Sequence, residues 1–241
     1  MAIDAGEDME RATLERLREA RAANRPAALL RWLDSGEEAL VVEGGPMTGA
    51  AVDDAVRRAV AHAWRRDRGA TLETARGPLF IQVFNPPLRL IVVGAVHITQ
   101  ALAPMAQLAG YDVTVVDPRR AFASDERFPD VKVSVEWPDE ALDQLRPDAR
   151  TAVVTLTHDP KLDDPALDRA LRSDAFYIAA LGSRRTHASR IERLEALGHD
   201  AAAIARIHGP AGLSIGAVSP AEIALSVMAE MTRTLREVPE P

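Results

Sequence analysis

The alternation of apolar runs with helical patterns divides the chain at Asn85-Pro86-Pro87, a segment typical of a rigid linker. After this linker, continuous apolar runs predict strands that are buried on both faces of a parallel sheet. The runs cover residues 88–93, 111–116, 151–157 and 175–181, with a shorter one at 131–135. Strands that alternate with helices over this length predict a doubly wound, Rossmann-like parallel sheet in an α/β domain of residues 88–241.

Helical patterns fill the intervals between these strands. Apolar residues at helical spacing predict helices from about residues 98, 138 and 184. The pair Asp164-Pro165 has the sequence of a helix cap followed by a first helical residue. The segment Ser219-Pro220-Ala221-Glu222 is a capping box, and it predicts a last helix that starts at its proline.

The part before the linker is shorter and mixed in pattern. The first 24 residues have a narrow apolar stripe at helical spacing, and Val52, Val56, Val60 and Trp64 recur every four residues. Residues 27–33, 39–42 and 79–84 have strand patterns, and the turn residues Asp34-Ser35-Gly36 join the first two as a hairpin. These features predict a smaller N-terminal α+β domain of residues 1–87.

Composition narrows the classes of function. The 241 residues carry a net charge of −7, which argues against a nucleic-acid partner because such proteins need a basic surface. The chain has no cysteine, so disulfides, thiolate metal sites and cysteine nucleophiles are excluded. Residues 1–10 lack the basic start and apolar run of a signal peptide, and the strongest apolar stretch, 88–96, is too short to span a bilayer. We therefore expect a cytoplasmic protein without a membrane span.

Ligands of doubly wound sheets bind at the carboxyl ends of the strands, and four segments of this chain fall there. The first, Gly94-Ala95-Val96-His97, has the position of a dinucleotide fingerprint, and Asp117 lies where an acidic residue would meet a ribose. Val96 and Thr99 replace the second and third glycines, so the fingerprint is broken. The segment predicts either a nucleotide site, as in an NAD(P)-dependent oxidoreductase, or a tight turn without a ligand.

The other three segments offer cations, an imidazole and a helix start. Asp117-Pro118-Arg119-Arg120 predicts either an anion site or a solvated loop. His158-Asp159 predicts either an acid–base group or a loop histidine that is held by the neighbouring aspartate. Gly182-Ser183-Arg184-Arg185 places two cations at a helix start, where they oppose the helix dipole, and this placement is favourable when an anion lies between them. This last segment predicts a phosphate-like ligand, against the alternative of a plain helix start.

Other kinds of site have little support in the sequence. The six histidines are scattered, without a pair four residues apart or a carboxylate at ligand spacing, so we expect no metal site. We also expect no catalytic Ser-His-Asp group. The glycine-rich segment 206–216 predicts either an ordered loop over the edge of the sheet or a plain connection.

Taken together and in this order, the segments resemble the XdhC/CoxI family, the accessory factors of xanthine dehydrogenase, carbon monoxide dehydrogenase and related molybdenum hydroxylases. The matching stretches are FIQVFNPPLRLIVVGAVHITQALA at 80–103, VTVVDPRRAFASDERF at 113–128, THD at 157–159, ALGSRR at 180–185 and RIHGPAGLSIG at 206–216. The resemblance covers about residues 80–236. It implies a Rossmann-type domain that binds the molybdenum–pterin cofactor as cargo, in its molybdopterin or its cytosine dinucleotide form.

The resemblance also implies a role and a set of contacts. Such a protein has no turnover of its own, presents the cofactor to a cysteine desulfurase for sulfuration and delivers it to the apo-enzyme of a molybdenum hydroxylase. A homodimer would be common for such a domain. Carried onto this sequence, the residues that would contact the cofactor are Gly94, Ala95 and His97 in the first turn, Asp117 and Arg119 in the second, His158 and Asp159 near the reactive end, and Gly182, Ser183, Arg184 and Arg185 at the phosphate.

The chain departs from the family pattern in two places. Many members have glycine where Val96 stands, and most carry a Ser-Gly-Gly-Cys-Val-Glu segment where this chain has residues 42–47 without cysteine. Sulfur for the cofactor therefore cannot pass through a thiol of this chain, and a partner must supply the persulfide. The remaining alternative is a scaffold with a vestigial pocket that acts only by protein contact.

Overall fold

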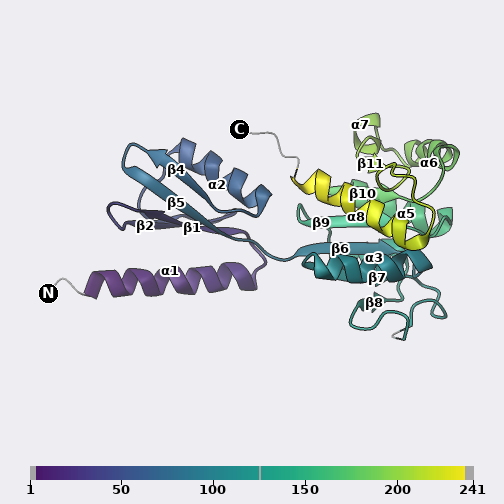
Figure 1. Cartoon of the computed structure of the whole chain (residues 1–241), viewed down its shortest axis with the longest axis horizontal. Helices are drawn as coiled ribbons and strands as arrows, with labels where there is room; N and C mark the ends of the chain where they lie inside the picture. The colour runs from purple at the N-terminus through teal and green to yellow at the C-terminus, as the bar shows by residue number, and fades with distance from the viewer. Residues whose placement is uncertain (1–3, 125, 237–241) are drawn as a thin grey trace. The chain divides into compact units, whose positions relative to one another are not determined.

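The computed structural model describes residues 4–124 and 126–236 (Figure 1). Residues 1–3, where the first predicted helix would begin, and the last five residues of the predicted C-terminal domain lie outside this part of the chain. The structure divides into two compact units. One contains the residues up to Pro86 together with Arg236, and the other contains Pro87–Leu235.

The first unit is an antiparallel sheet between two helices, which confirms the predicted α+β class. Its strands are β1 (Ala27–Trp32), β2 (Glu38–Val42), β3 (Thr48–Gly49), β4 (Ala70–Thr74) and β5 (Gly77–Phe84), in the order β3-β2-β1-β5-β4. The helix α2 (Asp54–Arg66) packs Val56 and Val60 on one face, and α1 (Asp4–Ala22) packs Ala20 on the other (Figure 1).

The second unit is a six-stranded sheet in which all neighbouring strands are parallel. Its strands are β6 (Leu88–Val93), β7 (Tyr111–Val116), β8 (Lys132–Ser134), β9 (Thr151–Thr155), β10 (Tyr177–Ala180) and β11 (Ile207–His208), in the order β11-β10-β9-β6-β7-β8. This is the strand order of a Rossmann fold, and it confirms the predicted doubly wound sheet. All five residues of β9 are buried, as its continuous apolar run requires.

Helices cover both faces of this sheet. One face packs against α3 (His97–Leu108) and α8 (Pro220–Arg236). The other packs against α4 (Pro138–Leu145), α5 (Pro160–Leu171), α6 (Arg184–Ala196) and the short α7 (Ala201–Ile204). None of the helices within residues 4–124 and 126–236 is both long and apolar enough to cross a membrane.

Some boundaries differ from the prediction for identifiable reasons. The helix α5 begins at Pro160 and not at Pro165, because Asp159 already caps it by accepting a hydrogen bond from the Lys161 backbone N–H at 3.0 Å. The strand predicted at 151–157 ends at Thr155, because its last two residues turn into the loop at the sheet edge, and the strand predicted at 175–181 is shortened at both ends to Tyr177–Ala180. The capping box of α8 is confirmed: the Glu222 carboxylate accepts the Ser219 backbone N–H at 2.8 Å.

Candidate functional site

The four predicted segments meet at one edge of the parallel sheet. They follow β6, β7, β9 and β10, whose carboxyl ends all point to that edge. The order of the strands reverses between β6 and β9, which is the position where doubly wound folds bind their ligands. This carboxyl edge is therefore the candidate site, and the loops differ in what they present there.

Most residues of the turn after β6 are packed against the protein interior and are not exposed to a ligand. Gly94 is buried with φ +114°, and a Cβ atom on it would lie 2.7 Å from the Thr157 methyl carbon of the loop after β9. Ala95 is fully buried. Only His97 is exposed, at the first position of α3, where Val96 makes no side-chain cap. Of the three predicted residues in this turn, His97 alone has a side chain free to meet a ligand.

The turn after β7 is closed by a buried carboxylate. Asp117 is 0% exposed and accepts hydrogen bonds from the Ala95 N–H at 2.8 Å and from the Arg119 backbone N–H at 3.0 Å. The Arg119 guanidinium adds two more, from Nε at 2.9 Å and Nη2 at 2.8 Å. The expected contact with a ribose is therefore not available, because both oxygens of Asp117 are already occupied. Arg119 is held in place and keeps an exposed side of its guanidinium.

This arrangement predicts a pH-dependent contribution of Asp117 to stability. Burial alone would raise the pKa of Asp117, but the hydrogen bonds from Arg119 and Ala95 hold it below its ordinary value. The stabilisation is thus present above the unfolded pKa of about 3.9 and is lost as the pH falls through the lower folded pKa. We expect Asp117→Asn to lower the free energy of unfolding by about 1.5–3 kcal/mol at neutral pH in urea titrations.

A neighbouring carboxylate provides the control for this prediction. Asp112 lies on β7, the strand that leads to Asp117, but it is exposed, and within the described residues it pairs only with Lys132. We expect Asp112→Asn to change the free energy of unfolding by less than about 0.5 kcal/mol. The difference in the free energy of unfolding between Asp117→Asn and the wild type should narrow below about pH 4. A difference that stays constant down to about pH 2 would contradict a stabilising role of the ionised Asp117 carboxylate.

The loop after β9 is organised by Thr157, which belongs to the THD motif but was not among the predicted site residues. The Thr157 hydroxyl accepts the Asp159 backbone N–H at 3.0 Å and donates to the buried Asp163 carboxylate at 2.7 Å. Asp159 caps α5, so its carboxylate is partly engaged. His158 is exposed, with φ +59° in the left-handed region. Of the two predicted residues in this loop, His158 is the one whose side chain is exposed.

The loop after β10 presents two cations at the start of a helix. Gly182 has φ +146°, and a Cβ atom there would lie 3.1 Å from the Thr186 side chain. Ser183, which was predicted to contact the phosphate, is exposed and caps α6 by accepting the Thr186 N–H at 3.1 Å. Arg184 and Arg185 are exposed, and neither makes an ion pair within the described residues.

Arg184 also lines a cavity at this edge. The cavity has a volume of about 340 Å³ and lies between the end of β10, the loop Pro210–Ala217 and α8. Backbone N–H groups fix the loop: Ala211 donates to the Ala180 carbonyl at 3.1 Å, and Gly212 donates to the buried Glu230 carboxylate at 2.9 Å. The glycine-rich segment therefore contains β11 followed by an ordered loop, and the cavity that this loop lines is preformed.

Two further features of the carboxyl edge were not predicted from the sequence. Phe122, in the loop after β7, is 45% exposed, and the Arg119 guanidinium carbon lies 4.7 Å from its ring centroid. The segment Gly212-Leu213-Ser214-Ile215-Gly216 has the spacing of a hydrolase motif, which the sequence prediction did not take into account. Ser214 lies in a loop that ends before α8 and not on a strand-to-helix turn, so it lacks the setting of a nucleophile elbow.

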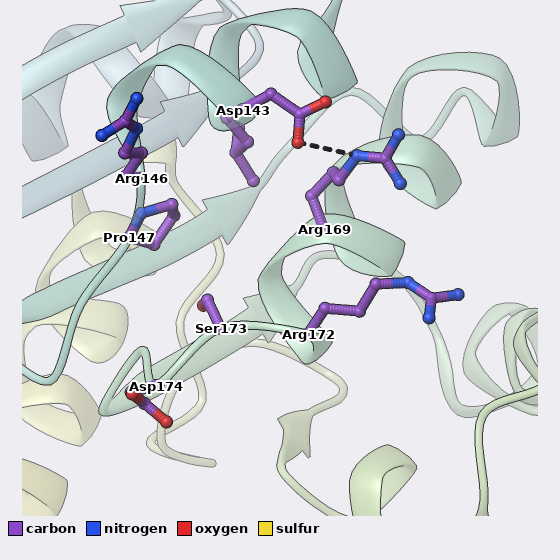
Figure 2. A pocket seen from close by; sticks show the side chains of 8 residues that line it. Asp143, Arg146, Pro147, Arg169, Arg172, Ser173 and Asp174 are labelled. Atoms are coloured by element: carbon purple, nitrogen blue, oxygen red, sulfur yellow. Dashed lines mark ion pairs between the residues drawn. The ribbon is translucent and has the colours of Figure 1, made fainter.

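A second cavity lies at the opposite, amino edge of the sheet. It has a volume of about 530 Å³, and Figure 2 shows the side chains that line it at the ends of α4 and α5. Its cations are largely neutralised: Arg169 pairs with Asp143 at 2.9 Å, and Arg172 pairs with Asp168 at 2.8 Å. None of the predicted site residues lines it. The larger cavity is therefore not the candidate site.

Across residues 4–124 and 126–236, no group of three or more histidine, aspartate or glutamate side chains gathers closely enough to hold a metal ion. The chemistry of the carboxyl edge is that of an anion site. Arg119, Arg184 and Arg185 are cations, and His97 and His158 are exposed imidazoles.

Comparisons with known proteins point to one family. The family model described as the XdhC Rossmann domain matches residues 90–231. A probable xanthine dehydrogenase subunit of Bacillus subtilis (strain 168) is 33% identical over 161 residues, which cover 66% of this chain and 47% of that protein. The molybdenum cofactor insertion chaperone PaoD of Escherichia coli (strain K12) is 33% identical over 148 residues, covering 61% and 40%. The chain thus spans less than half the length of each of these relatives.

A solved structure supports the same architecture. The crystal structure described as a xanthine dehydrogenase from Bacillus halodurans superimposes with a TM-score of 0.70, covering 94% of this chain and 67% of that one. The two sequences are 24% identical, so this likeness concerns the fold alone.

Proposed function

Because the chain belongs to the XdhC family, we propose that it is a maturation factor of molybdenum enzymes, which binds the molybdenum–pterin cofactor and has no turnover of its own. We assign this role to the predicted domain of residues 88–241. Relatives whose names describe a molybdenum cofactor insertion chaperone and a xanthine dehydrogenase subunit support a role in maturation.

The observation that carries the proposal is the position of Arg184 and Arg185. Both are exposed cations at the start of α6, and Arg184 lines the preformed cavity beside it. A phosphate there would meet the guanidinium groups and the free N–H groups of the helix start together. The molybdenum–pterin cofactor carries such a phosphate, and its organic part would lie against the apolar lining of the cavity.

The rest of the edge fits a bound cargo better than a nicotinamide cofactor. The side chains of His97 and His158 are exposed and that of Arg119 is partly exposed, whereas Asp117 is buried and has no oxygen free for a ribose. An NAD(P)-dependent oxidoreductase would need that contact and a close approach to the backbone, which Val96 opposes.

Binding measurements test the proposal directly. The purified chain is titrated without oxygen with molybdopterin, with its cytosine dinucleotide form, and with NAD⁺ and NADPH. We expect micromolar binding of at least one pterin form and none of the nicotinamide cofactors. The comparison of the two pterin forms decides which cargo is carried. If neither form binds and the chain does not slow the oxidation of added cofactor, the proposal is wrong.

Sulfuration and delivery are the finer part of the proposal. The chain has no cysteine, so the persulfide must come from a cysteine desulfurase acting on the bound cofactor. We expect the loaded chain to activate a molybdenum hydroxylase apo-enzyme only after incubation with the desulfurase and cysteine. Equal activation when the desulfurase is omitted would contradict this division of roles.

A further inference from the structure

A buried ion pair lies behind the site and serves no role in the function proposed above. Asp163 of α5 and Arg190 of α6 have side chains that are each 2% exposed, with 3.7 Å between the Asp163 carboxylate and Arg190 Nη2. That distance is too long for a hydrogen bond. Within the described residues, Nε and Nη1 of Arg190 and one carboxylate oxygen of Asp163 have no hydrogen-bond partner.

Such a pair is a poor stabiliser. Burial raises the pKa of Asp163 and lowers the pKa of Arg190, so the loss of solvation destabilises the charged form of each side chain. A buried pair returns its desolvation cost only when its geometry is good and its remaining polar atoms are hydrogen-bonded. This pair meets neither condition, and its presence therefore calls for a reason other than stability.

The two partners contact different loops of the candidate site. The other oxygen of Asp163 accepts the Thr157 hydroxyl at 2.7 Å, and that hydroxyl accepts the Asp159 N–H. Nη2 of Arg190 donates to the Leu181 carbonyl at 2.9 Å, one residue before Gly182. The pair thus joins the loop that carries His158 to the loop that leads into the two exposed arginines at the start of α6.

We propose that Asp163 and Arg190 are positioning residues, whose pairing fixes the spacing between the loop after β9 and the loop after β10. His158 then faces one part of a bound ligand while Arg184 and Arg185 face its anionic group. The effect on the ligand rests on the proposed function, whereas the coupling of the two loops does not. Neither positioning residue touches the ligand, because both are buried beneath the loops.

The same two helices contain a matched control. Asp164 of α5 and Arg193 of α6 also pair, with 3.0 Å between Arg193 Nη2 and a carboxylate oxygen, but the Arg193 side chain is 38% exposed. Within the described residues, the other hydrogen bond of Arg193 goes to the Ser189 carbonyl of its own helix. This second pair therefore links the helices without touching a loop of the site.

The test replaces each pair by apolar side chains of similar size. The variants are Asp163→Leu with Arg190→Met, and Asp164→Leu with Arg193→Met. Since neither variant leaves a lone buried charge, both should fold with stability near that of the wild type. We expect backbone hydrogen exchange at 155–159 and 180–186 to become about tenfold faster in the first variant and to stay unchanged in the second. Molybdopterin affinity should fall in the first variant only.

The outcomes separate this inference from the proposed function. Equal exchange rates at the two loops in both double variants would overturn the positioning role, whatever the ligand does. If the wild type binds no molybdopterin, the proposed function fails, and the exchange rates still decide whether the pair couples the loops.

A milder variant covers the case in which the first double variant does not fold. Thr157→Val keeps the ion pair and the side-chain shape but removes the hydroxyl that links Asp163 to the loop. We expect faster exchange at 155–159 and a return to the wild-type rate in Thr157→Ser. Unchanged exchange in Thr157→Val would overturn the inference by itself.

Discussion

Replacing both Arg184 and Arg185 by alanine is expected to weaken molybdopterin binding by about 100-fold. Each charge-assisted hydrogen bond to a phosphate contributes about 1.5–3 kcal/mol, and the lower value applies to these exposed side chains. Two such bonds give about 3 kcal/mol, or about 100-fold in the dissociation constant. Calorimetric titration of wild type and variant measures the change.

The folded chain itself should not suffer from this replacement. Arginines in the first turn of α6 oppose the helix dipole, so the variant is expected to melt at the wild-type temperature or slightly above it. Loss of binding with undiminished thermal stability would separate a ligand contact from a folding defect. A clear fall in the melting temperature would contradict the assignment of Arg184 and Arg185 to the ligand.

Arg57 and Arg58, two neighbouring arginines of α2, provide the control. Both are exposed in the middle of α2, and their replacement by alanine changes the net charge by the same amount. We expect this variant to bind molybdopterin like the wild type. An equal loss of affinity in both double variants would mean that the ligand is attracted by overall charge, and no loss in either would place the ligand elsewhere.

The sequence predicted the elements of the second unit because parallel strands leave a strong pattern. Strands such as β6 and β9 are buried on both faces, so each appears as an unbroken apolar run. The weak elements are at the edges: β4 has no fully buried residue, and β11 has only two residues. Two Asp-Pro pairs near the start of α5 carry the same capping signal, and only the structure shows that the first one is used.

The candidate loops could be found from the sequence, but the direction of their side chains could not. Gly94 and Ala95 were expected to meet a ligand, and they are buried because the turn packs on Thr157, which is far along the chain. Asp117 turns inward for the same kind of reason, since it completes its hydrogen bonds with Ala95 and Arg119. Such contacts depend on tertiary packing, which local patterns do not record.

The positioning pair left a signal that could have been found. Asp163 lies four residues before Leu167 on α5, and Arg190 lies four residues before Leu194 on α6. Both therefore fall in line with buried apolar residues of their helices, where a charged side chain is unusual. A charge in the apolar stripe of each of two consecutive helices indicates a buried pair.

Replacing Arg190 alone by methionine is expected to have the largest effect on stability. The change leaves the Asp163 carboxylate buried without its cation, and removal of one partner of a buried pair costs about 3–5 kcal/mol. That is a large share of the stability of a typical domain, which is about 5–15 kcal/mol. Urea unfolding near neutral pH measures the loss, and adding Asp163→Leu to the same chain should restore most of it.

The pH dependence of this loss identifies its cause. Burial already raises the pKa of Asp163, and without Arg190 the pKa should rise further, because an opposing charge is removed. A carboxyl whose folded pKa lies above its unfolded value destabilises the fold at high pH, and the penalty fades as the pH falls through the folded pKa. The difference in the free energy of unfolding between Arg190→Met and the wild type should therefore narrow as the pH falls from neutral towards the raised folded pKa of Asp163. If this difference in the free energy of unfolding does not change with pH, the loss of stability comes from altered packing and not from the unpaired Asp163 carboxylate.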